Sequence, residues 1–342
     1  LLQQQPLDQA TSIFQATNDL ALKISSKALL GLETSSGTRH LADVMRAILE
    51  GMFSKLSLVP VDLPGTPYRQ QRQRMETVER MLSAEIETKR RTPDDSILST
   101  LITATDEEGS KFTDAELISN TFLLFFAGHD TAACTLAWLL FLIGQHPEVE
   151  QRLIQEIRDH VGDAYPRYEQ VAEMPYLDHV VKEGMRVLPA SVVFPRFAAE
   201  DTALGGYHVP AGTEVLFSPL MAHHEAHVYP QPRRFDPDRW EDIQPGRFEF
   251  LPFGGGARRC LGMPFSDHMI RLVLAMIVPR LRFEVPAKTR VDVQVNVVMS
   301  PANGLPAIAR RPDPNRRSTH HPVRGFIHEL VDLPSARSVK QQ

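Results

Sequence analysis

Apolar side chains recur at helical spacing through the first part of the chain. An amphipathic helix places apolar residues at intervals of three and four along the sequence. This spacing predicts helices over Ser12–Leu32, Leu41–Phe53, Gln70–Arg90 and Asp94–Thr103. The proline-rich segment Val59–Pro67 interrupts the series and predicts a loop.

A long apolar helix is predicted next. Thr113 with Glu116 three residues later has the pattern of a capping box. The helix that starts there contains no proline before Gln145, and Pro147 stands where a new helix begins. A further helix is predicted over Tyr176–Leu188, directly before a proline.

The pattern changes after Pro189, where short β-like segments alternate with proline-containing turns. Pro230–Trp240 carries three prolines and predicts an irregular segment, and Cys260–Leu281 predicts a helix. Strands are predicted over Val192–Ala198, Glu214–Phe217, Phe283–Val285, Val291–Val297 and Pro306–Ala309. This order predicts a mainly α fold with a minor β region, in a single domain over residues 1–311. Residues 312–342 are polar and predict a disordered tail.

The segment Thr121–Gly144 is long and apolar enough to suggest a membrane span. His129 and Asp130 lie near its middle, where an ionised aspartate costs about 2.5–3.5 kcal/mol on insertion scales. A buried central helix explains the same residues better, so we predict no membrane segment in this chain.

Composition narrows the class of protein. The 342 residues are 42% hydrophobic and 23% charged, as in ordinary globular proteins, and the net charge of -5 argues against nucleic acid as a partner. Two cysteines cannot build a disulfide framework, which favours a reducing, cytoplasmic compartment. The chain begins with Leu1, not methionine, so a leader or membrane anchor before it stays an open alternative.

Cys260 follows three consecutive glycines and two arginines, in the segment Phe253–Gly262. Glycines let the backbone turn tightly and approach a flat ligand closely. The two arginines and the start of a helix favour a thiolate at this cysteine. The alternative is an anion-binding loop with an incidental thiol. Cys134, in an apolar helical segment, is predicted to be core filler.

This loop resembles the haem-binding signature of the cytochromes P450, F-x-x-G-x-R-x-C-x-G. The positions are matched by Phe253, Gly256, Arg258, Cys260 and Gly262. The resemblance implies haem b (iron protoporphyrin IX) as cofactor, with Cys260 as the axial ligand of the iron. It also implies that Arg258 pairs with a haem propionate, that Phe253 packs beside the thiolate, and that Gly254 and Gly262 border the cofactor.

A second motif lies inside the long apolar helix, at Ala127–Thr131. A glycine with two polar neighbours destabilises a buried helix, so the block is either a packing notch or serves a site. It resembles the A-G-x-[DE]-T oxygen-binding segment of the same family, in which Ala127 and Gly128 would border the haem. The resemblance implies that Thr131 hydrogen-bonds the iron-bound peroxo group and that Asp130 helps deliver protons for O–O cleavage.

A third set of residues resembles the family's structural motifs. Glu183 and Arg186, three apart on one helix, match E-x-x-R, although such a spacing alone is typical of a surface ion pair. Phe235–Trp240 resembles the meander motif, which would add Arg239 to a buried network with these two residues. Arg196 matches a position that often binds a propionate; the alternative is an exposed strand arginine.

The resemblance further implies an apolar substrate pocket, for which ordinary core packing is the alternative. Its predicted lining is Phe122, Phe126, Val192, Val193, Phe194, Val297 and Val298. The segment Phe53–Tyr68 resembles the branch with retinoic-acid hydroxylases and their cyanobacterial relatives. This suggests an isoprenoid, retinoid or lipid-like substrate.

The implied function is a haem-dependent monooxygenase that inserts one atom of O2 into a C–H bond of a hydrophobic small molecule. Electrons would come from NAD(P)H through a separate ferredoxin or flavoprotein reductase, since the sequence shows no flavin or nicotinamide motif. Two alternatives stay open: a peroxide-driven haem-thiolate enzyme, and a non-catalytic remnant or ligand-binding fragment of this fold. Because the resemblance covers Phe14–Arg311 and lacks the family's N-terminal strands and helices, we expect this chain to hold haem poorly.

The histidines of His223–His227 do not have the H-E-x-x-H spacing of a zinc site and are predicted to form a surface cluster. For His320 and His321, in the tail, no specific role is predicted.

Overall fold

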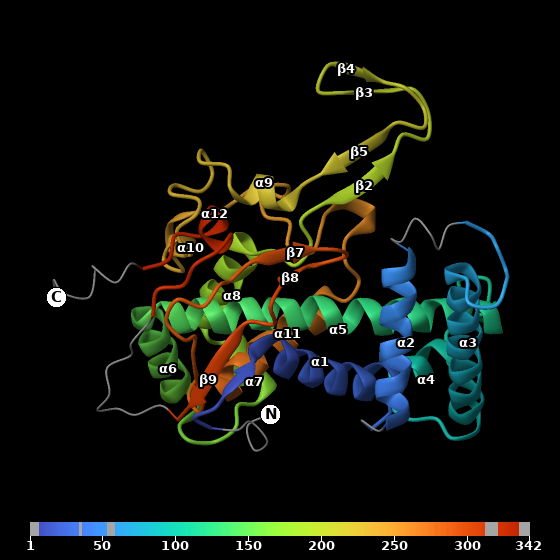
Figure 1. The fold of residues 1–342 in the computed structure, drawn as a ribbon, viewed down its shortest axis with the longest axis horizontal. Coiled ribbons are helices and arrows are strands. Elements are labelled where there is room, and N and C mark those ends of the chain that lie inside the picture. The colour runs from blue at the N-terminus through green and yellow to red at the C-terminus, as the bar shows by residue number, and fades with distance from the viewer. Residues whose placement is uncertain (1–6, 34–35, 53–58, 312–320, 335–342) are drawn as a thin grey trace. The chain divides into compact units, whose positions relative to one another are not determined.

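The computed structural model describes residues 7–33, 36–52, 59–311 and 321–334 (Figure 1). The chain divides into two compact units, Leu1–Thr17 with Thr131–Gln342, and Asn18–Asp130. Helices α1 (Ile13–Leu30) and α5 (Asp114–Gln145) each contain a boundary between the units. Helices dominate both units and the strands form small sheets, so the predicted mainly α fold with a minor β region is confirmed.

The unit Asn18–Asp130 is helical. Besides parts of α1 and α5 it contains α2 (Ser36–Met52), α3 (Pro67–Arg91) and α4 (Ile97–Thr103). Buried side chains from all five helices form its core, including Leu22, Met45, Leu82, Leu98 and Phe125.

Helix starts in this unit are decided by caps. The Thr66 hydroxyl accepts a hydrogen bond from the Arg69 amide, and Pro67 is the first residue of α3, as the predicted loop before it requires. Ser96 caps α4, which therefore starts at Ile97 rather than at the predicted Asp94.

Two other boundaries differ from their predictions. Helix α2 starts five residues before the predicted Leu41, because its first turn is polar and carries no apolar signal. Its predicted end at Phe53 lies outside the described residues, as do residues 53–58 of the predicted substrate-related segment.

The other unit is built around the second half of α5. The predicted capping box starts this helix: the Thr113 amide donates to Glu116 Oε2 at 2.8 Å, and the Glu116 amide donates to Thr113 Oγ1 at 3.3 Å. From Ala132 to His146 the side chains are buried, and the helix ends at Gln145 as predicted. By length and composition α5 could span a membrane, since its most apolar window has a mean hydropathy of 1.4. That window is, however, 72% buried within the protein, as in the core helix of a globular protein.

The remaining helices belong to this second unit. They are α6 (Pro147–Val161), α7 (Tyr168–Ala172), α8 (Pro175–Val187), α9 (Pro219–His223), α10 (Arg239–Asp242), the 3₁₀ turn η1 (Gly256–Arg258), α11 (Met263–Ile277) and α12 (Ile327–Leu330). Glycines allow α5 to approach its neighbours closely. A Cβ on Gly144 would lie 2.6 Å from the Phe283 carbonyl oxygen, and one on Gly184 of α8 would overlap Leu139.

Within the part of the chain that the structure describes, four small antiparallel sheets accompany these helices. The largest has the order β1 (Ala10–Ser12), β9 (Pro306–Arg310), β6 (Arg282–Glu284), so the start of the chain pairs with its C-terminal part. The others pair β2 (Phe194–Phe197) with β5 (Glu214–Phe217), β3 (Thr202–Leu204) with β4 (Tyr207–Val209), and β7 (Val293–Val295) with β8 (Met299–Pro301).

Strands β1, β3, β4 and β8 were not predicted. The β3–β4 hairpin, which projects at the top of Figure 1, had a usable signal, because Gly205 and Gly206 take the positive φ angles that its two-residue turn needs. Strands β1 and β8 are three residues long, too short for an alternating pattern to stand out.

The predicted disorder of residues 312–342 is wrong for residues 321–334. Val323, Ile327 and Val331 are buried there, and α12 forms between them. The Arg324 amide donates to the Thr289 carbonyl and the Val291 amide to the Arg324 carbonyl, which ties the segment to the chain before β7. Three well-spaced apolar residues are enough to anchor a short polar segment. The rest of the predicted tail lies outside the described residues.

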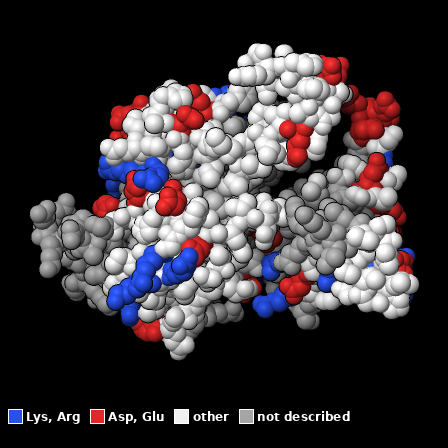
Figure 2. Space-filling model, turned by 45° about the horizontal axis from the view of Figure 1, so that its top comes forward, with Lys and Arg blue, Asp and Glu red and all other residues white. Residues whose placement is uncertain are grey.

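On the face shown in Figure 2, the basic side chains form small groups with acidic side chains beside them, and most of that surface is uncharged.

Replacing Gly144 by alanine should lower the free energy of unfolding by about 1–3 kcal/mol, because the added methyl meets a backbone carbonyl that cannot rotate away. Gly51→Ala is the matched control: there the methyl meets the end of the Gln71 side chain, which can move. Denaturant unfolding followed by tryptophan fluorescence measures both. Equal stability of the two variants would contradict the close approach of α5 and β6.

Candidate active site

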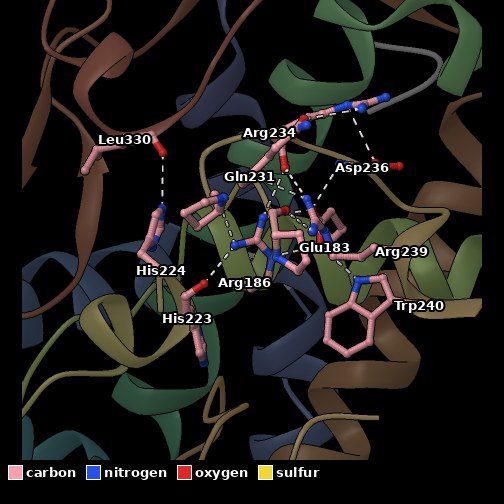
Figure 3. A network of polar contacts seen from close by, with 12 residues as sticks. Glu183, Arg186, His223, His224, Gln231, Arg234, Asp236, Arg239, Trp240 and Leu330 are labelled. Atoms are coloured by element: carbon pink, nitrogen blue, oxygen red, sulfur yellow. Dashed lines mark hydrogen bonds and ion pairs between the residues drawn. The ribbon is translucent and has the colours of Figure 1, made fainter. Parts of the chain in front are cut away.

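The carboxylate of Glu183, on α8, is fully buried and accepts five hydrogen bonds (Figure 3). Arg186, one turn further along, donates from Nε to Oε2 at 2.9 Å and from Nη2 to Oε1 at 2.8 Å. Arg239 Nε and the Asp236 amide each reach Oε1 at 2.9 Å, and the indole N–H of Trp240 reaches Oε2 at 3.0 Å. The predicted network of Glu183, Arg186 and Arg239 is therefore formed in the structure.

The other N–H groups of the two guanidinium groups donate hydrogen bonds to backbone carbonyls. Arg186 donates to the carbonyls of His223, Pro232 and Arg234 at 2.7–3.1 Å. Arg239 donates to those of Pro230, Gln231 and Arg234. Apart from that of His223, the last residue of α9, these carbonyls belong to an irregular segment that cannot satisfy them through regular secondary structure. The network therefore fixes the path of the meander between α9 and α10.

Two aromatic residues, Tyr229 and Trp240, connect the meander to the backbone just before the cysteine loop. The Tyr229 hydroxyl donates to the Glu249 carbonyl at 3.0 Å, and the Trp240 and Phe250 rings meet edge to face at 4.7 Å between centroids. The backbone that leads into the loop is thus held against the meander at two adjacent residues.

The loop itself is a tight backbone turn with an exposed thiol. The φ angles of Gly254 and Gly256 are 70° and 69°, which side-chain-bearing residues adopt at a cost. The Cys260 amide donates to the Phe253 carbonyl at 2.9 Å and closes the loop. Helix α11 begins at Met263 with Gly262 as its N-cap, three residues later than predicted, because Cys260 belongs to the closed loop.

The residues of this loop fit a haem group by their chemistry. Cys260 is an exposed free cysteine, and thiolate is a haem-iron ligand. Within the described residues, neither Arg258 nor Arg196 forms an ion pair, and the Arg196 guanidinium donates to the carbonyl of Pro195. Both are exposed and available to carboxylates. The Phe194 ring lies 3.7 Å from where a Cβ on Gly254 would be, so an apolar side chain borders the glycines.

The segment Ala127–Thr131 lies on α5, at the boundary between the two units. Asp130 Oδ1 lies 3.2 Å from His129 Nε2 and 3.6 Å from Arg46 Nη2. Burial opposes ionisation of this carboxyl, but the hydrogen bond and charge of His129, together with the charge of Arg46, outweigh it and hold the Asp130 pKa below its ordinary value. Asp130 is therefore a carboxylate at neutral pH.

Gly128 also serves packing within its unit. Its carbonyl accepts a hydrogen bond from the Ser25 hydroxyl at 3.1 Å, and a Cβ would lie 3.2 Å from Leu29 of α1. The alternative of a packing notch therefore holds for this glycine. Ala127 is exposed, and the Thr131 carbonyl accepts a hydrogen bond from the Thr135 hydroxyl.

The predicted pocket residues fall in both units. Phe122 and Phe126, half-buried on α5, belong to the unit Asn18–Asp130. In the other unit, the Met299 amide donates to the Ala190 carbonyl at 2.8 Å, which holds the chain after Val297 and Val298 against the chain before Val192. This bond joins residues that lie next to the two segments predicted to line a pocket in that unit, Val192–Phe194 and Val297–Val298.

Three residues that contribute to these sites were not predicted from the sequence. Trp240 was part of a recognised motif, but its hydrogen bond to Glu183 was not predicted. Arg46 carries no motif. The interpretation of His223–His227 as a surface cluster is wrong for His223, whose side chain is fully buried, although it holds for His227.

This chain is similar to known proteins in both sequence and fold. The sequence model for cytochrome P450 matches residues 2–306. Cytochrome P450 4c21 from Blattella germanica is 32% identical over 220 residues, which are 63% of this chain and 43% of that protein. Cyclooctatin synthase from Streptomyces melanosporofaciens is 36% identical over 216 residues, 61% of this chain and 47% of that protein. Cyclooctat-9-en-7-ol 5-monooxygenase from the same organism is 31% identical over 287 residues, 79% of this chain and 61% of that protein.

Solved structures agree on the fold. The retinoic acid-bound cyanobacterial CYP120A1 superposes with a TM-score of 0.82 at 23% identity, covering 91% of this chain and 72% of that one. The haem domain of cytochrome P450DA gives 0.81 at 22% identity, covering 91% and 70%. The chain spans about half the length of the curated relatives that it matches.

Glu183→Gln should lower the free energy of unfolding by about 3–5 kcal/mol, because it leaves the Arg186 and Arg239 charges buried without a counter-charge. Glu241→Gln, which removes an exposed ion pair with Arg152, should change it by less than about 1 kcal/mol. Urea unfolding of the two variants and the wild type measures the difference. Similar losses in both would show that the buried network is not what holds the meander.

Asp130→Asn should show a pH-dependent stability loss. Because the folded-state pKa lies below the ordinary value of about 3.9, the carboxylate contributes stability above that pH and loses it as the pH falls through the folded-state pKa. The stability difference between wild type and Asp130→Asn should be largest near neutral pH and shrink on acidification. Denaturant unfolding between pH 3 and 7 measures it, with the exposed Asp95→Asn as control. A difference that grows in acid would contradict the ion pairs.

Proposed function

This chain belongs to the cytochrome P450 family, and from that premise we propose that it is a haem-dependent monooxygenase. It would insert one atom of O2 into a C–H bond of a hydrophobic small molecule and use electrons from NAD(P)H. The observation that carries the proposal is the closed, glycine-rich loop that presents the free thiol of Cys260.

Cys260 would hold the haem iron as a thiolate, and Arg258 and Arg196 would bind the two propionates through their exposed guanidinium groups. When bound, a thiolate-ligated haem supplies the activation of dioxygen and the transfer of one oxygen atom to carbon. Phe253, Gly254 and Gly262 would border the macrocycle on the side of the cysteine.

Asp130 and Thr131 would handle protons. A carboxylate that stays ionised at neutral pH can accept a proton from solvent and pass it on, and the Thr131 hydroxyl next to it can donate one. His129 and Arg46 hold Asp130 Oδ1 and so fix the carboxylate in place. The positive charge of Arg46 favours the ionised form of this carboxyl.

For the substrate we propose an isoprenoid, retinoid or lipid-like molecule. The proposed lining is apolar throughout, and Val193 and Val297 are 44% and 40% exposed, so apolar surface is available to a ligand in that unit. One relative is named as a monooxygenase of cyclooctat-9-en-7-ol, which accords with an apolar alcohol as the kind of substrate. We further propose a cytoplasmic location and electron delivery by a separate ferredoxin or flavoprotein reductase.

Two other functions would use the same loop. A peroxide-driven haem-thiolate enzyme needs no proton delivery for dioxygen cleavage, so the ion pairs of Asp130 favour the monooxygenase. A non-catalytic remnant would keep the fold, but the exposed thiol in its closed loop favours cofactor binding.

The carbon monoxide difference spectrum of the reduced protein tests the proposal. The wild type reconstituted with haem should show the strongly red-shifted Soret band of a thiolate-ligated haem, and Cys260→Ser should lose that band. Cys134→Ser, which changes the buried cysteine, is the matched control and should keep it. A spectrum that is the same in the wild type and in Cys260→Ser would exclude Cys260 as the ligand. Turnover with NAD(P)H and a reductase, set against turnover with peroxide alone, separates the monooxygenase from the peroxide-driven enzyme.

A further inference from the structure

His223 connects the buried charge network to the loop that carries Cys260. It is the last residue of α9 and is fully buried. Its carbonyl accepts a hydrogen bond from Arg186 Nη1 at 2.8 Å, and its ring Nε2 accepts one from the Leu251 amide at 2.7 Å. Figure 3 shows the carbonyl facing Arg186 and the ring pointing away from the network. One residue thus contacts both structures with different groups.

The bond to Leu251 fixes the protonation state of the ring. A backbone N–H can only donate, so Nε2 must carry no proton and the proton of the neutral ring must be on Nδ1. Burial, and then the positive charge of Arg186, lower the His223 pKa to about 3. Among the residues that the structure describes, Phe250 packs against the ring at 5.4 Å between ring centroids, and Arg186 and His224 are the charged and titratable groups that act on its pKa.

Leu251 starts a short series of backbone bonds that ends at the cysteine. The Leu251 carbonyl accepts from the Gly254 amide at 3.1 Å, and the Phe253 carbonyl accepts from the Cys260 amide at 2.9 Å. The Leu251 amide, in turn, is used by His223. If the bond to His223 were lost, a partly buried donor at the base of the loop would have no acceptor, and the turn at Gly254 would lose its support.

We propose that His223 is a positioning residue for the Cys260 loop, and that it acts through the hydrogen bond which its unprotonated Nε2 accepts from the Leu251 amide. The proposal rests on the proposed function only in naming the loop as the haem site. The bond itself can be tested in the protein without haem.

A matched pair of substitutions separates this role from simple space-filling. Glutamine and methionine have similar lengths and volumes, but glutamine carries a strong carbonyl acceptor near the place of Nε2, whereas the thioether sulfur of methionine accepts only weakly. His223→Gln should therefore keep the loop as in the wild type, and His223→Met should loosen it. His227→Gln, at a side chain that is 74% exposed, controls for the loss of a histidine nearby.

Amide hydrogen exchange of the haem-free protein is the first measurement. In His223→Met, the amides of Leu251, Phe253 and Gly254 should exchange about tenfold faster than in the wild type, as loss of one hydrogen bond predicts. The rate at which Cys260 is alkylated, measured in a Cys134→Ser background, should differ between His223→Met and the protein that keeps His223. His223→Gln should restore both toward the wild type. Equal amide exchange rates in His223→Met and His223→Gln would overturn the proposal. Exchange rates in His223→Met that equal those of the wild type would overturn it as well.

Nitrogen-15 NMR of histidine-labelled wild-type protein gives a second, independent test, and it decides the matter if His223→Met does not fold. The proposal requires an unprotonated Nε2 and a protonated Nδ1 on His223 from pH 5 to 8. A proton on Nε2 would overturn it.

Haem retention connects this test to the proposed function. Haem should dissociate faster from His223→Met than from His223→Gln. If the haem-free tests succeed but Cys260→Ser retains the wild-type spectrum, the proposed function fails while the role of His223 in the loop stands.

Discussion

The burial of one carboxylate constrains the C-terminal half of this protein. Glu183 has no solvent exposure, and a buried charge is tolerated only where opposite charges and hydrogen bonds replace its hydration. Five donors from four residues fulfil that requirement, and three of those residues lie in the meander more than fifty positions away. The meander therefore takes the path that brings its donors to Glu183, and its irregular backbone is satisfied by the two arginines in return.

The Glu183 network and the cysteine loop that lies next to it differ in their exposure to solvent. The network is buried, whereas Cys260 and Arg258 are exposed and available for a ligand. Tyr229, Trp240 and His223 link the two regions through the backbone of residues 249–251. Ligand-binding groups on a loop gain precision when the backbone beneath them is fixed. The contacts with residues 249–251 hold the cysteine loop in place, and its glycines allow the positive φ angles that the turn needs.

The sequence was most informative where the signal was local. The Thr113–Glu116 capping box and Pro147 correctly predicted the limits of α5, and the spacing of apolar residues predicted α1, α3 and α8 within a few residues. The Glu183 network could not come from spacing, because an E-x-x-R pair on a helix is usually solvated; only the resemblance to a known family predicted it. The role of His223 was out of reach, since its ring partner is 28 residues away and is a backbone amide, which leaves no trace in side-chain patterns.

The sequence separation within the network has a consequence for biosynthesis. When α8 leaves the ribosome, Glu183 and Arg186 can pair only with each other, three residues apart and in water. The remaining donors to the carboxylate, from Asp236 to Trp240, are translated 53 to 57 residues later. Because closing a chain segment of that length must precede burial of the pair, the nascent helix keeps a hydrated polar face until the meander has been made. The cysteine loop follows directly after, so it emerges onto a base that has just become able to form.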